Sequence, residues 1–161
     1  MANGEAGAVA DAPDRPTHHG TAIALGRRAV LIVGPSAGGK SDLALRCLTL
    51  APSALIPQGA QLVADDRVIL TPAAGRLYVE APASISGLIE VRGLGILRVP
   101  HVPRADLVLI AELAPPEEIE RLPDPPLTRA IEGVELPLVR IAAFEASAAA
   151  KLLLALTRAP G

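Results

Sequence analysis

The sequence is poor in aromatic residues and in cysteine. Tyr78 and Phe144 are the only aromatic residues among 161, and tryptophan is absent. Half of the residues are nevertheless apolar, so the core must consist of Leu, Val, Ile and Ala. A protein that stacks single-stranded nucleic acid on several aromatic side chains is therefore excluded. Cys47 is the only cysteine; it cannot form an internal disulfide, and it indicates a reducing compartment.

A strong charge of one sign and long hydrophobic runs are lacking too. The formal net charge is −2, which gives no reason to expect nucleic acid or an anionic membrane as a partner. No apolar run approaches the roughly 18 residues of a transmembrane helix. The first 16 residues lack the basic end and the apolar stretch of a signal peptide. We therefore expect a cytoplasmic protein without a membrane or nucleic-acid partner.

The pattern along the chain predicts a disordered tail and one α/β domain. Residues 1–16 are rich in Ala, Gly, Pro and Asp without periodicity, and residues 17–161 fit one domain. Strands are expected at residues 21–24, 29–33, 61–64, 68–70, 77–79, 88–92, 96–99, 106–113 and 134–141. Helices are expected at 40–50 and 145–157, the second with Glu145 at its positive end and Arg158 at its negative end. The proline-rich, acidic stretch 114–126 predicts a solvated connection with one helical turn.

A glycine-rich loop lies between the strand at 29–33 and the first helix. Its residues are Gly34, Pro35, Ser36, Ala37, Gly38, Gly39, Lys40 and Ser41. They match the P-loop template in full, in which backbone N–H groups and a helix N-terminus surround phosphate oxygens. We expect Lys40 to reach the β- and γ-phosphates of ATP and the Ser41 hydroxyl to bind Mg²⁺. A chance glycine-rich turn is the plain alternative, which the position between a strand and a helix disfavours.

Two further motifs and a His-Gly pair accompany this loop. Residues 62–68 are Leu-Val-Ala-Asp-Asp-Arg-Val, and residues 87–96 are Gly-Leu-Ile-Glu-Val-Arg-Gly-Leu-Gly-Ile. With His19-Gly20, they resemble the catalytic domain of the HPr kinase/phosphorylase family, where such motifs occur in this order. The resemblance covers residues 17–157. It implies an α/β P-loop fold similar to the nucleotide domain of phosphoenolpyruvate carboxykinase, with a mixed sheet and flanking helices, in a short form without the N-terminal domain of long members.

This resemblance also implies an activity and a partner. The family uses ATP and magnesium to phosphorylate a serine of HPr, the small phosphocarrier of the bacterial sugar phosphotransferase system. Many members run the reverse reaction, in which inorganic phosphate attacks phosphoserine and gives pyrophosphate. Members commonly assemble as hexamers.

The family's catalytic residues carry over onto both motifs. Asp65 resembles the catalytic aspartate, a base in the forward direction and an acid in the reverse. Asp66 would orient its neighbours, and His19 would lie near the phosphates. Arg92 would neutralise transition-state charge. Adjacent aspartates can also be a solvated turn, and a histidine beside a disordered tail can simply face solvent.

The second motif supplies the expected metal ligand. Glu90 resembles the second protein contact to magnesium, with Ser41 as the first. Glu90 and Arg92, two apart on an expected strand, lie on one face and could instead form a surface ion pair.

The chain departs from the family pattern at three places. Ala37 stands where the family usually has glycine and Gly38 follows it, so we expect the flexible position of the loop to shift by one residue. The stretch 52–59 makes a longer connection before Asp65. The basic loop after Ile96 is abbreviated to residues 99–105, which puts the reverse reaction and the hexamer in question. Arg98 precedes this segment, and His101 and Arg104 lie within it; we expect these three residues to replace that loop in part.

Two other functions remain open at this point. A P-loop small-molecule kinase or NTPase would use the apolar strand 107–111 followed by Glu112 to bind magnesium. A regulatory module would bind ATP without catalysis. Phosphate transfer to HPr would separate both from a protein serine kinase.

Overall fold

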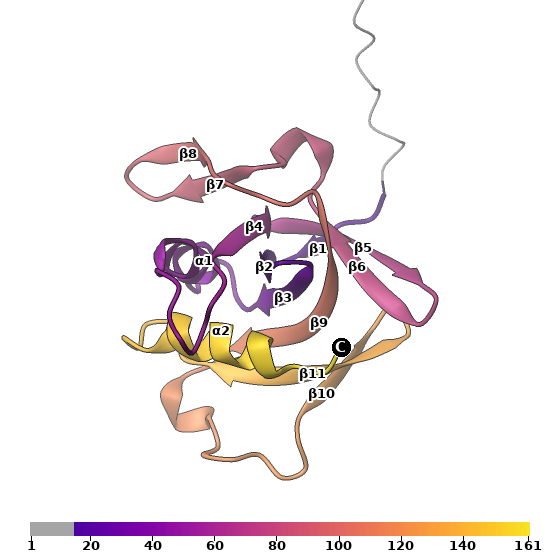
Figure 1. Cartoon of the computed structure of the whole chain (residues 1–161), viewed down its shortest axis with the longest axis vertical. Helices are drawn as coiled ribbons and strands as arrows, with labels where there is room; N and C mark the ends of the chain where they lie inside the picture. The colour runs from indigo at the N-terminus through magenta and orange to yellow at the C-terminus, as the bar shows by residue number, and fades with distance from the viewer. Residues whose placement is uncertain (1–14) are drawn as a thin grey trace, which may run out of the picture.

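The computed structural model describes residues 15–161 (Figure 1). Its α-helices are α1 (Lys40–Thr49) and α2 (Ala148–Arg158), with 3-10 turns η1 (Ala83–Ile85) and η2 (Pro116–Glu118). The strands are β1 (His18–His19), β2 (Thr21–Leu25), β3 (Arg28–Val33), β4 (Ala60–Ala64), β5 (Arg67–Ala73), β6 (Arg76–Glu80), β7 (Leu88–Val91), β8 (Gly95–Arg98), β9 (Arg104–Leu113), β10 (Thr128–Ile131) and β11 (Val134–Ile141). The predicted α/β class with a mixed sheet is confirmed.

Nine strands form one mixed sheet. Its main path runs β1-β5-β6-β9-β3-β2-β4, and β11 joins β9 and pairs with β10. Strand β9 is parallel to both β3 and β11, and the other pairs are antiparallel. Strands β7 and β8 form a separate antiparallel hairpin, which projects beyond the sheet at the top of Figure 1.

The central strands are buried on both faces, as their apolar sequence predicts. Because successive side chains of a strand point to opposite faces, Val30 and Ile32 of β3 pack with the helices. Leu31 points to the opposite face and packs there with residues of β5 and β6, such as Val68 and Leu77. Both helices cover the same side of the sheet, through residues such as Leu43 and Leu152 (Figure 1). Burying each such aliphatic side chain contributes about 1.5–3 kcal/mol, which fixes the strand that leads into the P-loop.

Two observed strands were not predicted, and one helix begins at a different residue. Strand β10 was not predicted, because its short run alternates exposed and half-buried residues at the end of the proline-rich connection. Strand β1 was not predicted either; it pairs with β5 and places His19 opposite Arg67. The second helix begins at Ala148 rather than Glu145, although Arg158 lies in its last turn as expected.

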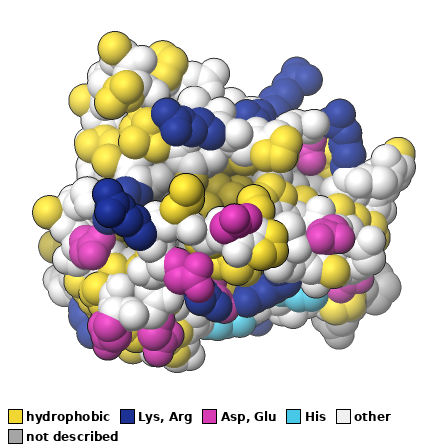
Figure 2. All heavy atoms as spheres, turned by 90° about the horizontal axis from the view of Figure 1, so that it is seen from below, with side chains coloured by type: hydrophobic (Ala, Val, Ile, Leu, Met, Phe, Trp, Pro, Cys, Tyr) yellow, Lys and Arg dark blue, Asp and Glu magenta, His cyan; other side chains and the backbone are white. Residues whose placement is uncertain are grey.

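The predicted tail lies almost wholly outside the described residues. Only Arg15 and Pro16 of residues 1–16 are described, and the Arg15 guanidinium pairs with the Glu80 carboxylate. In the described part of the chain, neither helix has the length and apolar character that crossing a membrane requires. On the face shown in Figure 2, basic and acidic side chains are dispersed among apolar ones.

Candidate functional site

The P-loop joins β3 to the N-terminus of α1. The residue before α1, Gly39, has a left-handed φ of 97°, and no side chain caps the helix within the described residues. The first N–H groups of α1 are therefore available to an anion. Ala37 also takes a left-handed φ, 59°. Ala37 thus adopts a conformation that glycine favours, and a Cβ at Gly38 would lie 2.8 Å from the Pro35 carbonyl oxygen; the expected shift of the flexible position stays a prediction.

Lys40 lies inside the loop rather than in solvent. Its side-chain ammonium donates hydrogen bonds to the carbonyls of Gly34 (3.0 Å) and Pro35 (2.7 Å), and the residue is 6% exposed. Burial lowers the pKa of the Lys40 ammonium below its usual range, while the negative charges of Asp66 and Asp65 oppose that shift. The loop thus holds a cation at the position where phosphate oxygens would bind.

Asp65 connects the P-loop to the second motif. Its Oδ1 accepts a 2.6 Å hydrogen bond from the Ser41 hydroxyl, and its Oδ2 accepts a 3.0 Å bond from the backbone N–H of Glu90. The residue is only 6% exposed. The second motif therefore reaches the P-loop region through the backbone of Glu90, and Asp65 connects the two. Whether Asp65 acts as the base stays a prediction.

Thr21, at the start of β2, fixes both aspartates. Its hydroxyl donates to Asp65 Oδ1 at 3.1 Å and accepts from the backbone N–H of Asp66 at 3.2 Å. Thr21 is fully buried. Sequence reasoning missed this residue, because a threonine that opens an apolar strand carries no distinctive signal.

Asp66 lies in the tight turn between β4 and β5, with a left-handed φ of 68°. Its Oδ1 is 3.4 Å from His19 Nδ1, and both side chains are substantially exposed. The backbone N–H of Gly20 donates to the Asp66 carbonyl at 2.9 Å. The structure therefore brings His19 to this turn, and its expected place near the phosphates stays a prediction.

The hairpin places Glu90 and Arg92 differently. Ile89 is buried in the core, while Glu90 is exposed on β7 with its backbone bound to Asp65. Strand β7 ends at Val91, so Arg92 lies in the turn, exposed. The prediction that Glu90 and Arg92 share one strand face is wrong. Among the described residues, no ion pair joins them, and no hydrogen bond joins Arg92 to Asp65.

Residues that would replace the abbreviated basic loop are partly engaged elsewhere. The Arg104 guanidinium lies over the Tyr78 ring, 4.2 Å from its centroid. His101 packs closely against Gly87, where an added Cβ would lie 2.7 Å from the imidazole.

Glu112, the acid of the alternative magnesium-binding strand, is held by two arginines. Its carboxylate oxygens accept bonds from Arg129 (2.6 Å) and Arg140 (3.0 Å). These bonds hold the pKa of the Glu112 carboxyl below its usual range. This pairing disfavours Glu112 as a metal ligand.

The site offers few protein ligands to a metal. Within residues 15–161, no three His, Cys, Asp or Glu side chains are grouped to hold an ion. Magnesium bound with nucleotide phosphates needs only one or two protein oxygens, because it keeps most of its waters. The Ser41 hydroxyl, in the first turn of α1, is one hard oxygen of this kind, so the P-loop fits magnesium that arrives with a nucleotide.

Solved structures share this fold. The HPr(Ser) kinase/phosphatase from Coxiella burnetii superposes with a TM-score of 0.67 at 30% identity, covering 89% of this chain and 94% of that one. The match confirms the predicted fold class, a P-loop domain of the phosphoenolpyruvate carboxykinase type.

Curated relatives and a family model agree with this match. HPr kinase/phosphorylase of Lactiplantibacillus plantarum is 33% identical over 139 residues, which are 80% of this chain and 42% of that protein. The enzyme of the same name from Clostridium tetani is 42% identical over 84 residues, or 52% of this chain and 25% of that protein. The chain thus spans less than half the length of these relatives. The model of the HPr Serine kinase C-terminal domain matches residues 12–158, so the chain belongs to that family.

Proposed function

We propose that this domain is a serine kinase that uses ATP and magnesium to phosphorylate HPr. The family membership supports this activity. The single observation that carries it is the 2.6 Å hydrogen bond between the Ser41 hydroxyl and Asp65. A buried carboxylate beside the P-loop is positioned to meet a hydroxyl group that approaches the terminal phosphate.

In the forward reaction, Asp65 accepts the proton of the HPr serine. The serine oxygen attacks the γ-phosphorus, the bond from that phosphorus to the β–γ bridging oxygen breaks, and ADP leaves. Lys40 and the N–H groups of residues 34–41 stabilise the charge on the phosphates. Magnesium, when bound with ATP, adds further neutralisation of the phosphate oxygens.

The remaining site residues have supporting roles in this proposal. Ser41 would hold magnesium that arrives with ATP, and Glu90 would be the second protein ligand, as the family resemblance implies. Thr21 and His19 hold Asp65 and Asp66 in place through the contacts described above. Arg92, at the exposed hairpin turn, contributes positive charge when HPr binds.

The reverse reaction uses the same groups. Inorganic phosphate attacks the phosphoserine phosphorus, the serine oxygen leaves and takes a proton from Asp65, and pyrophosphate forms. The names of the relatives include phosphorylase as well as kinase. Five residues, 99–103, separate β8 from β9 here. The rate of the reverse reaction therefore tests whether this short segment can replace the basic loop of long members. Hexamer formation, which we expect from the resemblance, is tested by analytical ultracentrifugation.

One experiment tests the proposal. The protein is incubated with HPr, magnesium and γ-labelled ATP, and inorganic phosphate is then added and pyrophosphate assayed. Label on HPr serine supports the kinase, and label released as pyrophosphate supports the reverse reaction. ATP hydrolysis without labelled HPr would favour a small-molecule kinase or NTPase. ATP binding without turnover would favour a regulatory module.

A further inference from the structure

An exposed aromatic ring lies against the P-loop, on the segment that follows β11. Phe144 is the only phenylalanine of the chain and is 77% exposed. A Cβ built on Gly39 would lie 3.0 Å from the Phe144 Cζ, so the ring contacts the loop at the start of α1. An aromatic ring left in water beside a phosphate loop is available for stacking with a ligand.

A pocket of about 430 Å³ adjoins this ring, a volume within the range of small-molecule sites. Three segments line it: the P-loop, the end of β9 with the residues after it, and residues 142–145. The lining residues are Pro35, Gly38, Leu113, Ala114, Pro115, Pro116, Ala142, Ala143, Phe144 and Glu145. The P-loop thus forms one wall of a largely apolar pocket.

The order of the strands places this pocket opposite the acidic residues. On one side of β3 lie β2 and β4, and β4 leads to Asp65; on the other side lie β9 and β11. A nucleotide whose terminal phosphate faces Asp65 would extend its other end toward β9 and β11. We propose that this pocket holds the base of the nucleotide, stacked against Phe144. The proposal rests on the proposed function and adds to it the site of the base.

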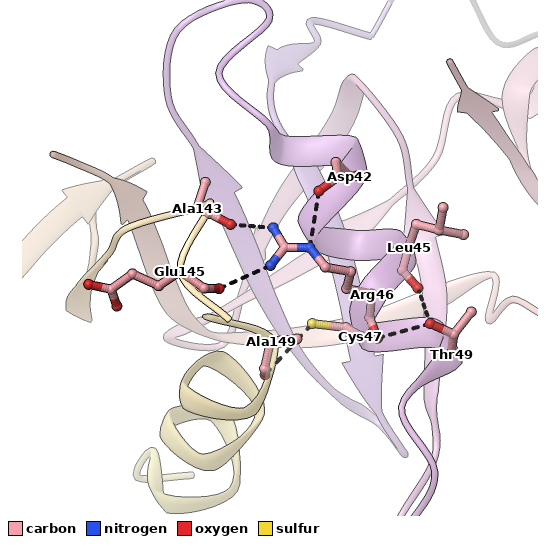
Figure 3. A network of polar contacts seen from close by, with 8 residues as sticks. All are labelled: Asp42, Leu45, Arg46, Cys47, Thr49, Ala143, Glu145 and Ala149. Atoms are coloured by element: carbon pink, nitrogen blue, oxygen red, sulfur yellow. Dashed lines mark hydrogen bonds and ion pairs between the residues drawn. The ribbon is translucent and has the colours of Figure 1, made fainter. Parts of the chain in front are cut away.

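Arg46 of α1 binds the backbone on either side of Phe144, at Ala143 and Glu145 (Figure 3), and is the positioning residue for this ring. Its guanidinium donates to the carbonyls of Ala143 and Glu145, the residues on either side of Phe144, and to Asp42 Oδ2 at 3.0 Å. Because the guanidinium is a rigid planar donor, it fixes the backbone that carries Phe144 relative to the P-loop.

The lining also determines how selectively a base is recognised. Pro115 and Pro116 have no N–H group, and the other lining side chains are mostly alkyl. Glu145, the one ionisable residue among those described in the lining, pairs with Lys151 at 2.7 Å. Such a pocket binds the aromatic face of a base and reads few of its polar edges. Adenine and guanine nucleotides should therefore bind within a few-fold of one another.

Calorimetry with two ligands tests the proposal on the full chain. ADP carries a base, whereas inorganic tripolyphosphate occupies only the phosphate loop. Phe144→Ala should weaken ADP binding about tenfold, the loss expected for one base–aromatic stack, and leave tripolyphosphate affinity unchanged. Phe144→Tyr should retain ADP affinity. Leu122→Ala serves as control, because Leu122 is 83% exposed and lies outside this lining.

Arg46→Ala should also weaken ADP binding and spare tripolyphosphate. The double variant with Phe144→Ala should be no weaker than Phe144→Ala alone, because Arg46 acts through the ring. Unchanged ADP affinity in Phe144→Ala, or equal loss for both ligands, would overturn the base site while the phosphate site stands. A wild-type protein that binds neither ligand would overturn the proposed function as well.

Discussion

The Ser41 hydroxyl donates to Asp65 Oδ1 at 2.6 Å, and the two residues are 24 positions apart in the chain. Ser41 lies in the first turn of α1 and Asp65 follows β4, so this bond joins the P-loop to the acidic turn. The same carboxylate accepts the Glu90 N–H through its other oxygen. One buried side chain thus links all three motifs, and each prediction about catalysis depends on it.

Lys40→Ala should weaken ATP binding at least about 100-fold, because two or more charge-assisted hydrogen bonds to phosphate are lost. Calorimetry with ATP and magnesium measures this. The Lys40 ammonium also binds two loop carbonyls, so Lys40→Met, which keeps the aliphatic stem, is the matched control for loop packing. Both variants should lose ATP affinity alike; unchanged affinity in either would remove Lys40 from the phosphate site.

Asp65→Asn should retain ATP binding and lose at least about 100-fold of the transfer rate to HPr, since a general base typically contributes that much. The Asp65 carboxylate accepts hydrogen bonds from Thr21, Ser41 and Glu90. The NH₂ group of an asparagine cannot accept them, so the substitution should also lower the stability of the fold. Thermal unfolding is therefore measured beside the single-turnover rate. Full turnover in a folded Asp65→Asn protein would assign the base elsewhere.

Asp66→Asn separates the two adjacent carboxylates. Asp66 is exposed and contacts His19, whereas Asp65 is buried against Ser41. We expect Asp66→Asn to lower the transfer rate less than about tenfold, because it removes an orienting charge and no base. If Asp66→Asn abolished transfer and Asp65→Asn did not, the two roles would be exchanged.

Local patterns predicted the elements that build the phosphate site. The β-branched run before Gly34, the glycine-rich loop and the periodicity of α1 are signals within one short segment, so they identified β3 and α1. The family resemblance, rather than a local pattern, implied that Asp65 and Glu90 act at one site. Each of these features depends either on residues close in sequence or on the motifs that carry the family resemblance.

Features that arise from distant contacts could not be predicted. His19 reaches Asp66 because β1 pairs with β5, and no local pattern encodes that pairing. The start of α2 is displaced because Arg46, about 100 residues earlier, binds the carbonyls of Ala143 and Glu145. Thr21 was missed for the same reason: its two partners are 44 and 45 positions away.

Glu90→Gln should raise the magnesium concentration required for half-maximal transfer several-fold, because a neutral amide oxygen is a weaker ligand for this ion. The backbone N–H of Glu90 would still bind Asp65, so ATP binding and thermal stability should change little. Glu112→Gln is the matched control, since Glu112 is engaged by two arginines. An identical magnesium titration for Glu90→Gln would exclude its side chain from the metal ligands.

Cys47 should make the stability of the fold sensitive to alkaline pH. Burial raises the pKa of its thiol from 9.0 to about 12, with an opposing effect of Arg46. The unfolded chain therefore loses this proton at lower pH than the folded one. Below pH 9 the contribution to stability is complete, and between pH 9 and 12 it falls by about 1.4 kcal/mol per pH unit. Urea unfolding at a series of pH values, compared between wild type and Cys47→Ala, isolates this group from other alkaline titrations. The free energy of unfolding of the variant should decline less steeply with pH. Equal slopes would mean that the Cys47 thiol has the same pKa in the folded and unfolded chains.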